Sequence, residues 1–239
     1  HSENRPEWFF ADIGIQAIGA VSVGLYPTNP APEVKYLLSH SESKVLFAED
    51  QEQVDKALEV IESLPMLEKI VYFEDRGLYN YDHPKLMTFT EFLEIGKAEN
   101  ESFPEYVEEQ QDNINDDDVA FLVYTSGTTG KPKGSMITHG NISWVASQIP
   151  NFSLVENVKA KDPQFLSYLP LCHIFGRLTD LLIASHTMAT INFAESIDTV
   201  QMDLAEIQPT IFPAVPRILE RMHSGAMVKI RDASFIKRQ

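Results

Sequence analysis

The sequence predicts an α/β fold built of several layers, in which parallel β-sheets are flanked by helices. Two observations lead to this prediction. Helical and strand patterns alternate along the chain, and a strand–helix–strand order implies a parallel sheet. In addition, the chain has 239 residues, of which 44% are hydrophobic and 23% are charged, so it can bury a sizeable core as one large domain or two small ones.

The N-terminal part of the chain holds helix candidates that are each followed by a strand candidate. Helices are indicated by apolar residues at i, i+3, i+4 spacing, and strands by short apolar runs. In chain order, these candidates are a helix at 6–20, a strand at 21–26, a helix with Val34, Leu37 and Leu38, a strand at 44–48, a helix with Val54, Ala57, Leu58, Ile61 and Leu64, and a strand at 69–73.

Between residues 74 and 118 the apolar pattern weakens and acidic residues accumulate. We interpret this stretch as a solvated acidic excursion with one short helix at 88–95. The aspartates at 116–118 do not indicate a calcium loop of the EF-hand type, because the glycine and the distant glutamate of that loop are absent. They are predicted to be solvated surface.

Strand and helix patterns resume at Val119. The run "VAFLVY" at 119–124 predicts a strand that leads into a loop, and a helix is expected to begin near "THGN" at 138–141. The remaining candidates are strands at 165–169 and 188–193, a helix between them at 174–185, and a final helix at 213–222.

The formal net charge of −16 argues against a nucleic-acid-binding protein, because such proteins neutralise phosphates with basic surfaces. The single cysteine excludes a disulfide within the chain and fits a reducing compartment. No apolar run approaches the ~18 residues of a membrane span. No signal peptide is recognised, so we expect a cytoplasmic protein and coincidental glycosylation sequons at Asn100, Asn141 and Asn151.

The segment "YTSGTTGKPKG", Tyr124 to Gly134, carries the strongest functional signal. A cluster of glycine and hydroxyl residues after a strand is first of all a loop. Three features point further, to a phosphate-binding loop: glycines let backbone N–H groups approach a ligand, hydroxyls can donate to phosphate oxygens, and lysines add positive charge. The glycines are Gly127, Gly130 and Gly134, and the lysines are Lys131 and Lys133.

This segment does not follow the Walker pattern Gly-x-x-x-x-Gly-Lys-Ser/Thr. Five residues past Gly127 stands Pro132, and five past Gly130 stands Ser135, so the second glycine of the pattern is missing. Pro132 also disfavours the α conformation of the residue before it, which should keep the loop extended.

Together with "MITHGN" at 136–141, the segment resembles the signature loop of the adenylate-forming superfamily, which includes acyl- and aryl-CoA synthetases, luciferases and peptide-synthetase adenylation domains. Ser135 departs from the small aliphatic residue that is usual there, and its hydroxyl suits a partly wet strand end. The resemblance implies a binding site for the β- and γ-phosphates of ATP, formed by Thr125, Ser126, Gly127, Thr128, Thr129, Gly130, Lys131, Lys133 and Gly134.

The segment "LPLCHIFGR", Leu169 to Arg177, is the second informative stretch. Cys172 beside His173 does not indicate a thiol catalyst, because adjacent side chains point apart and no third orienting group follows. We interpret Cys172 as a small buried residue. No metal site is predicted at His173, since the other histidines lack ligand spacing. Arg177 is interpreted as a structural arginine that pairs with an acid such as Asp180.

This stretch resembles the superfamily segment that contributes to the acyl pocket, in the form closest to long-chain fatty acyl-CoA synthetases. The sequences at 4–8, 26–47 and 215–222 resemble the same subfamily. The resemblance implies that His173 lines the substrate site near the reacting carboxylate. The alternative is a histidine whose hydrogen bonds are satisfied in the core beneath the loop.

By this resemblance, the whole protein would be a long-chain fatty acid–CoA ligase that uses ATP, Mg²⁺ and coenzyme A. Residues 1–239 would be part of its N-terminal AMP-binding domain, with the acidic excursion at about 74–118 and the phosphate loop at 124–134. The C-terminal domain would be absent, so we expect the isolated fragment to be inactive. We also expect peripheral membrane association of the full-length protein.

Two alternatives stay open. The protein could be another adenylate-forming ligase that acts on aryl or shorter acyl acids. From a different class, the fragment could be a non-catalytic nucleotide- or acyl-binding module that regulates a partner. A lysine-bearing C-terminal domain encoded downstream would favour a ligase, whereas a natural stop near Gln239 would favour the module.

Overall fold

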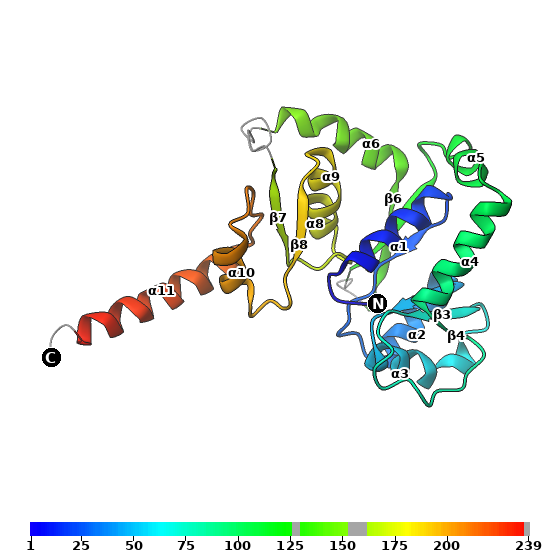
Figure 1. Ribbon diagram of the computed structural model, residues 1–239, viewed down its shortest axis with the longest axis horizontal. Helices are drawn as coiled ribbons and strands as arrows, with labels where there is room; N and C mark the ends of the chain where they lie inside the picture. The colour runs from blue at the N-terminus through cyan, green and yellow to red at the C-terminus, as the bar shows by residue number, and fades with distance from the viewer. Residues whose placement is uncertain (126–129, 153–161, 237–239) are drawn as a thin grey trace.

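The computed structural model describes residues 1–125, 130–152 and 162–236. Within these ranges the strands form three small sheets, whose strand orders are β1-β5-β6, β2-β3-β4 and β7-β8. Helices lie against the sheets, and the last helix extends away from the rest of the molecule (Figure 1). The predicted α/β architecture with parallel sheets flanked by helices is confirmed.

The sheet β2-β3-β4 is wholly parallel, as the strand–helix–strand order predicts. Val45 of β2 pairs with Lys69 of β3, and Ile70 of β3 pairs with Leu86 of β4. The elements of this unit are α2 (Ala31–His40), β2 (Val45–Ala48), α3 (Gln51–Glu59), the short 3₁₀ helix η1 (Ile61–Ser63), β3 (Lys69–Tyr72) and β4 (Leu86–Thr88).

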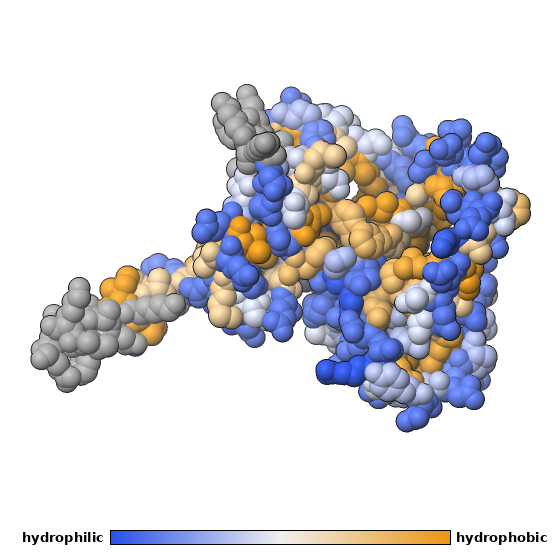
Figure 2. Space-filling model, viewed as in Figure 1, coloured by the Kyte–Doolittle hydropathy of each residue, from blue (hydrophilic) through white to orange (hydrophobic). Residues whose placement is uncertain are grey.

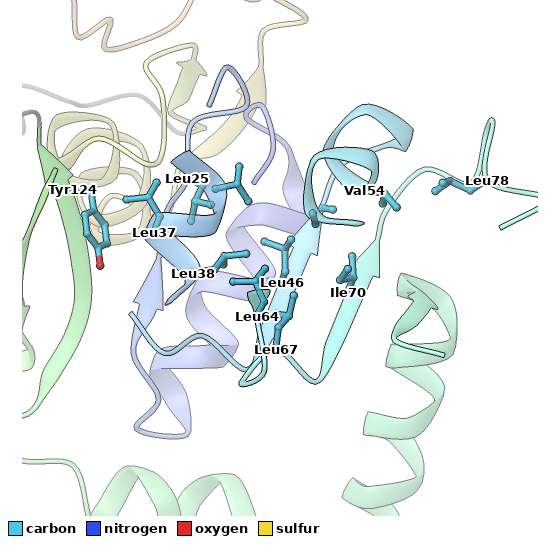
Figure 3. Close-up of a cluster of buried hydrophobic side chains, with 13 residues drawn as sticks. Leu25, Leu37, Leu38, Leu46, Val54, Leu64, Leu67, Ile70, Leu78 and Tyr124 are labelled. Carbon is cyan, nitrogen blue, oxygen red and sulfur yellow. The ribbon is translucent and has the colours of Figure 1, made fainter. Parts of the chain in front are cut away.

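The largest core cluster joins this sheet to α2 and α3 (Figure 3). The apolar stripes predicted for the two helices supply much of it, because helical spacing places these residues on one face. The cluster also includes Tyr124, which comes from the strand that leads into the predicted phosphate loop. Its buried members are Leu25, Val34, Leu37, Leu38, Leu46, Ala48, Val54, Ala57, Leu64, Leu67, Ile70, Leu78 and Tyr124.

The acidic stretch at 74–118 contains more regular structure than we predicted. Besides β4, it holds α4 (Phe89–Ser102) and α5 (Tyr106–Asp112), so the helix predicted at 88–95 extends to residue 102. The hydroxyl of Thr88 caps α4, and Glu91 completes the capping box. No residue of α4 or α5 is buried, which agrees with the expected solvated surface.

The sheet β1-β5-β6 carries the predicted phosphate loop. β1 (Ser22–Val23) runs parallel to β5 (Val119–Thr125), and β5 forms an antiparallel hairpin with β6 (Lys133–Thr138). We predicted β5 but not β6. The flanking helices are α1 (Pro6–Ala17) and α6 (His139–Gln148), and the 3₁₀ helix η2 (Ile149–Asn151) follows α6.

The last sheet pairs β7 (Gln164–Ser167) with β8 (Thr190–Phe193) in parallel. The helix between them is made of α8 (Ile174–Gly176), a π-helical segment η3 (Arg177–Ile183) and α9 (Ala184–His186). Two helices follow, α10 (Val200–Ile207) and α11 (Pro216–Ile236). The final helix therefore begins three residues later than predicted, at a proline that suits a first helical position, and continues well past residue 222.

Candidate phosphate-binding site

The candidate site lies at the open end of the β5–β6 hairpin. Thr125 ends β5 and pairs with Lys133, which begins β6, so the two side chains stand at the same end of the sheet. Both residues are exposed. Four of the predicted phosphate-binding residues, Ser126, Gly127, Thr128 and Thr129, lie outside the described residues. The hairpin therefore places Thr125, Gly130, Lys131, Lys133 and Gly134 around one loop.

Gly130 has a backbone conformation that favours glycine. Its φ angle is +149°, and no atom lies within 4 Å of the position that a Cβ would occupy. A side chain there would be strained by the backbone, although it would have room. The exposed, unobstructed backbone at Gly130 is the kind of surface that a phosphate can approach closely.

Lys131 and Lys133 are free to bind an anion. Both side chains are exposed, and neither forms an ion pair with an acidic residue in the part of the chain that the structure describes. The ammonium of Lys131 lies 5.1 Å from the centroid of the Tyr36 ring. In a chain with a net charge of −16, these lysines supply local positive charge at the loop.

Gly134 has a packing role that the sequence does not reveal. It stands opposite Tyr124 in the hairpin, and a Cβ at Gly134 would lie 3.2 Å from Cζ of the Tyr124 ring. The ring therefore occupies the space above the glycine. Burial raises the pKa of the Tyr124 hydroxyl, so this group keeps its proton, and it lies 2.7 Å from Nδ1 of His40 on α2.

The exit from the hairpin is also fixed. The hydroxyl of Thr138 accepts a hydrogen bond from the backbone N–H of Asn141 and begins α6 where we predicted a helix. The backbone N–H of His139 donates to the carbonyl of Asp118, and that of Gly140 donates to the carbonyl of Asp116. The aspartates at 116–118 thus belong to a turn that supports α6. Ser135 is exposed on β6, so water can form hydrogen bonds with its hydroxyl.

His173 is exposed and caps α8. Its Nδ1 accepts a hydrogen bond from the backbone N–H of Phe175 at 3.1 Å. The interpretation of His173 as a satisfied core residue is therefore wrong. The turn before it is tight, since a Cβ at Gly176 would lie 2.5 Å from the carbonyl oxygen of Pro170. Among the described residues, no hydrogen bond or ring contact joins His173 to the hairpin end.

Asn4 holds the segment before His173 in place. Its side-chain amide donates to the hydroxyl of Ser167 at 2.9 Å and to the carbonyl of Leu169 at 2.8 Å, and its Oδ1 accepts from the N–H of Leu171. Two stretches that we singled out in the sequence, 4–8 and 169–177, are therefore in direct contact. Residues so far apart in the chain could not be paired from the sequence.

Arg177 does not pair with Asp180, contrary to our expectation. Its guanidinium forms an ion pair with Asp12 of α1, with 2.9 Å between Nη2 and Oδ1, and it lies over the rings of Phe121 and Trp8. The residue is structural, but its partner is long-range. Burial raises the pKa of Asp12 despite the opposing effect of the guanidinium, and burial lowers the pKa of Arg177.

Cys172 is buried, as predicted. Burial raises the pKa of its thiol to about 12, so the thiolate that a nucleophile needs is not formed at neutral pH. In the ranges that the structure describes, no group of three or more histidine, cysteine or acidic residues could hold a metal ion, and no helix is both long and apolar enough to cross a membrane.

An apolar cavity of about 350 Å³ lies beside the Asp12–Arg177 pair. It is bounded by α1, by α6 and by the helical segment that follows His173. Figure 2 shows hydrophobic surface gathered over the middle of the molecule, where α1 lies in Figure 1. The apolar residues that line the cavity include Ile13, Phe121, Ile142, Ile174, Leu178 and Leu181.

Comparisons with known proteins show the family to which the chain belongs. Residues 1–238 match the family model described as AMP-binding enzyme. Over 99% of its length, the chain is 33% identical to long-chain-fatty-acid–CoA ligase ACSBG2 of Xenopus laevis, of which it covers 32%. It is 32% identical to long chain acyl-CoA synthetase 4 of Arabidopsis thaliana, with all of the chain and 35% of that protein covered. The chain thus spans about a third of the length of these relatives.

Among solved structures, ATP-bound MatB from Rhodopseudomonas palustris has the same fold. The TM-score is 0.66 at 17% sequence identity, and the match covers 92% of this chain and 39% of that one. The family match over nearly the whole chain, the similarity to two acyl-CoA ligases and the shared fold lead to one conclusion: this chain belongs to the AMP-binding enzyme family.

Proposed function

We propose that the whole protein is an ATP-dependent ligase that joins a long-chain fatty acid to coenzyme A, and that residues 1–239 are part of its AMP-binding domain. The β5–β6 hairpin carries this proposal, because its end presents Thr125, Gly130 and the exposed lysines Lys131 and Lys133 to the solvent. The relatives named as long-chain-fatty-acid–CoA ligase and long chain acyl-CoA synthetase support the substrate class.

The proposed reaction has two steps. A carboxylate oxygen of the fatty acid forms a bond to the α-phosphorus of ATP while the bond to pyrophosphate breaks, which gives acyl-adenylate. The thiol sulfur of coenzyme A then forms a bond to the acyl carbon, AMP leaves, and the thiol loses its proton. The first step brings two anions together and leaves negative charge on the departing pyrophosphate. Groups that stabilise this charge therefore lower the barrier of the step.

In this proposal, the hairpin end holds the β- and γ-phosphates. Lys131 and Lys133 offer ammonium groups, Thr125 offers a hydroxyl, and the exposed backbone at Gly130 offers an N–H group. Ser126, Gly127, Thr128 and Thr129 would contribute to the same site. Gly134 belongs to the same predicted site, and the absence of its side chain also leaves room for the Tyr124 ring where β6 pairs with β5.

The chain fits Mg²⁺ as an ion held mainly by the nucleotide. Magnesium bound to ATP usually takes phosphate oxygens and water with only one or two protein ligands. The exposed hydroxyl of Thr125 is a suitable single oxygen donor. When bound, the ion would offset negative charge on the phosphate oxygens.

We further propose that His173 orients the fatty carboxylate. Its Nδ1 accepts a hydrogen bond from Phe175, so the proton of the neutral ring lies on Nε2. This N–H can donate to a carboxylate oxygen. His173→Gln should therefore raise the KM for the fatty acid, whereas His186→Gln, a change at an exposed histidine farther along the same helical segment, should not.

The acyl chain would occupy apolar space next to that histidine. Ile174, Leu178 and Leu181 line the 350 Å³ cavity and follow His173 in the chain. Each buried methylene contributes roughly 0.8 kcal/mol, so affinity should rise with chain length until the space is full. The acyl substrate also partitions into bilayers, and we propose peripheral membrane association of the whole protein at the inner face, which cosedimentation with lipid vesicles would test.

Thioester formation by the full-length protein tests the proposed function. The assay contains ATP, Mg²⁺, coenzyme A and one acid from the series acetate, hexanoate, benzoate and palmitate. We expect the highest kcat/KM for palmitate. An optimum at acetate or benzoate would assign the protein to another class of adenylate-forming ligase, and the absence of thioester with every acid would contradict a ligase function.

A further inference from the structure

One aromatic side chain on α2 touches two consecutive residues at the end of the hairpin. The hydroxyl of Tyr36 donates a hydrogen bond to the carbonyl oxygen of Pro132 at 2.9 Å. The ring of the same tyrosine lies under the ammonium of Lys131, 5.1 Å from ring centroid to nitrogen. A cation over an aromatic face at this distance is attracted to it. Tyr36 therefore restrains both the backbone and the lysine side chain.

Tyr36 is itself held in a fixed place. It lies on a helix whose neighbouring residues Val34, Leu37 and Leu38 are buried in the core. Its ring packs against that of His40, with 5.4 Å between centroids, and Nδ1 of His40 lies 2.7 Å from the hydroxyl of Tyr124. Because Tyr124 belongs to β5 and Pro132 precedes β6, α2 is tied to both sides of the loop.

We infer that Tyr36 is a positioning residue, which acts on the phosphates of the nucleotide through Lys131; this inference rests on the proposed function. A free lysine side chain samples many rotamers and loses this freedom when it binds an anion. Tyr36 limits these rotamers in advance, and its hydrogen bond to Pro132 fixes the backbone from which the lysine projects. Tyr36 does not touch the phosphates.

A double-mutant cycle in the full-length protein tests this inference. The variants are Tyr36→Phe, which keeps the ring, Tyr36→Leu, which removes ring and hydroxyl, Lys131→Met, and Tyr36→Leu combined with Lys131→Met. Tyr81→Phe is the control, because it removes a tyrosine hydroxyl that donates to Asp55 at 2.6 Å. The measurements are KM for ATP, kcat, the thermal midpoint, and the Kd of magnesium pyrophosphate by calorimetry.

The expected result separates the effect of the Tyr36 hydroxyl, which holds the backbone at Pro132, from the effect of the ring, which holds Lys131. Tyr36→Phe should raise KM for ATP about threefold, the usual effect of one lost hydrogen bond, and Tyr36→Leu about tenfold, with kcat changed less than about twofold. In the Lys131→Met background, Tyr36→Leu should add less than about a twofold change. Tyr81→Phe should leave KM unchanged.

Three outcomes would overturn the inference. They are an equal effect of Tyr36→Leu with and without Lys131, a lower KM in Tyr36→Leu, and a loss of activity that follows the thermal midpoint. If the wild-type protein does not consume ATP in the presence of fatty acid, the proposed function is wrong. The Kd of magnesium pyrophosphate then tests the role of Tyr36 independently of activity. Equal Kd values for wild type and Tyr36→Leu would then overturn the role of Tyr36.

Discussion

The carboxylate of Asp12 and the guanidinium of Arg177 form an ion pair inside the protein, with 2.9 Å between Oδ1 and Nη2. The side chains are only 2% and 4% exposed. The pair joins α1 to the helical segment that follows His173, and the guanidinium lies 4.1 Å from the centroid of the Phe121 ring on β5. It therefore connects the helical segment after His173 to β5, the strand that leads into the predicted phosphate loop.

Asp12→Asn should destabilise the protein strongly, because it leaves the buried guanidinium without a counter-charge. Loss of one partner of a buried pair typically costs about 3 to 5 kcal/mol. Asp198→Asn is the control, since Asp198 pairs with Arg221 on the surface, where the side chains are 72% and 59% exposed. That change should cost less than about 1 kcal/mol. Urea unfolding measures both free energies, and equal losses would contradict the role given to Asp12.

Gly134→Ala should destabilise the hairpin, because the added methyl group would press on the Tyr124 ring. An overpacked site typically costs about 1 to 3 kcal/mol. Gly96→Ala provides the control: Gly96 lies within α4, has no atom within 4 Å of its missing Cβ, and should gain about 0.5 to 1 kcal/mol in helical stability. Thermal unfolding of both variants measures these opposite effects on stability. A Gly134→Ala protein as stable as wild type would contradict a close contact between Gly134 and the Tyr124 ring.

Asp180→Asn should stabilise the protein at about pH 8 and have little effect near pH 4. Burial raises the pKa of Asp180 from 3.8 to about 6, against hydrogen bonds from Ser167 and Thr179 that lower it. The folded state therefore favours the neutral acid. This contribution to stability is fully present below pH 3.8 and is lost as the pH rises through about 6. Asparagine resembles the neutral acid, so the Asp180→Asn protein should not lose this contribution to stability as the pH rises.

Thermal midpoints of wild type and Asp180→Asn across this pH range test the prediction. Asp82→Asn, which makes the same substitution at an exposed aspartate, is the control for the substitution itself and should leave the thermal midpoint close to that of wild type. A parallel profile for wild type and Asp180→Asn would show that Asp180 does not titrate in the folded protein at a raised pKa.

The elements predicted from the sequence are those with strong local patterns. The strands around 44–48 and 69–73 are apolar runs that each follow a lysine, and α2 buries its predicted stripe. The second predicted helix is shorter than expected: α3 ends at Glu59 and buries Val54 and Ala57, whereas Ile61 lies in η1 and Leu64 follows it. β4 and β6 escaped prediction for a physical reason. β4 has only three residues and is recognised by its pairing with β3, and β6 has glycine and polar residues that are typical of loops.

The candidate site was predicted in its residue types but not in its supporting contacts. Glycines, hydroxyls and lysines after a strand indicate phosphate binding by local chemistry alone. The partners of Arg177, Gly134 and Lys131 are Asp12, Tyr124 and Tyr36, and none of these pairs follows from spacing. Helical spacing indicates Asp180 as the partner of Arg177, whereas in the fold the partner is Asp12 of α1.

Pyrophosphate exchange into ATP, driven by palmitate in the full-length protein, tests most directly whether the hairpin end binds the phosphates. Lys133→Ala removes an exposed charge at the start of β6, and Lys97→Ala removes an exposed charge on α4. We predict that Lys133→Ala slows exchange by about tenfold or more, the usual effect of one lost charged hydrogen bond, while Lys97→Ala exchanges like wild type. Unchanged exchange in Lys133→Ala would contradict the assignment of the hairpin end to phosphate binding.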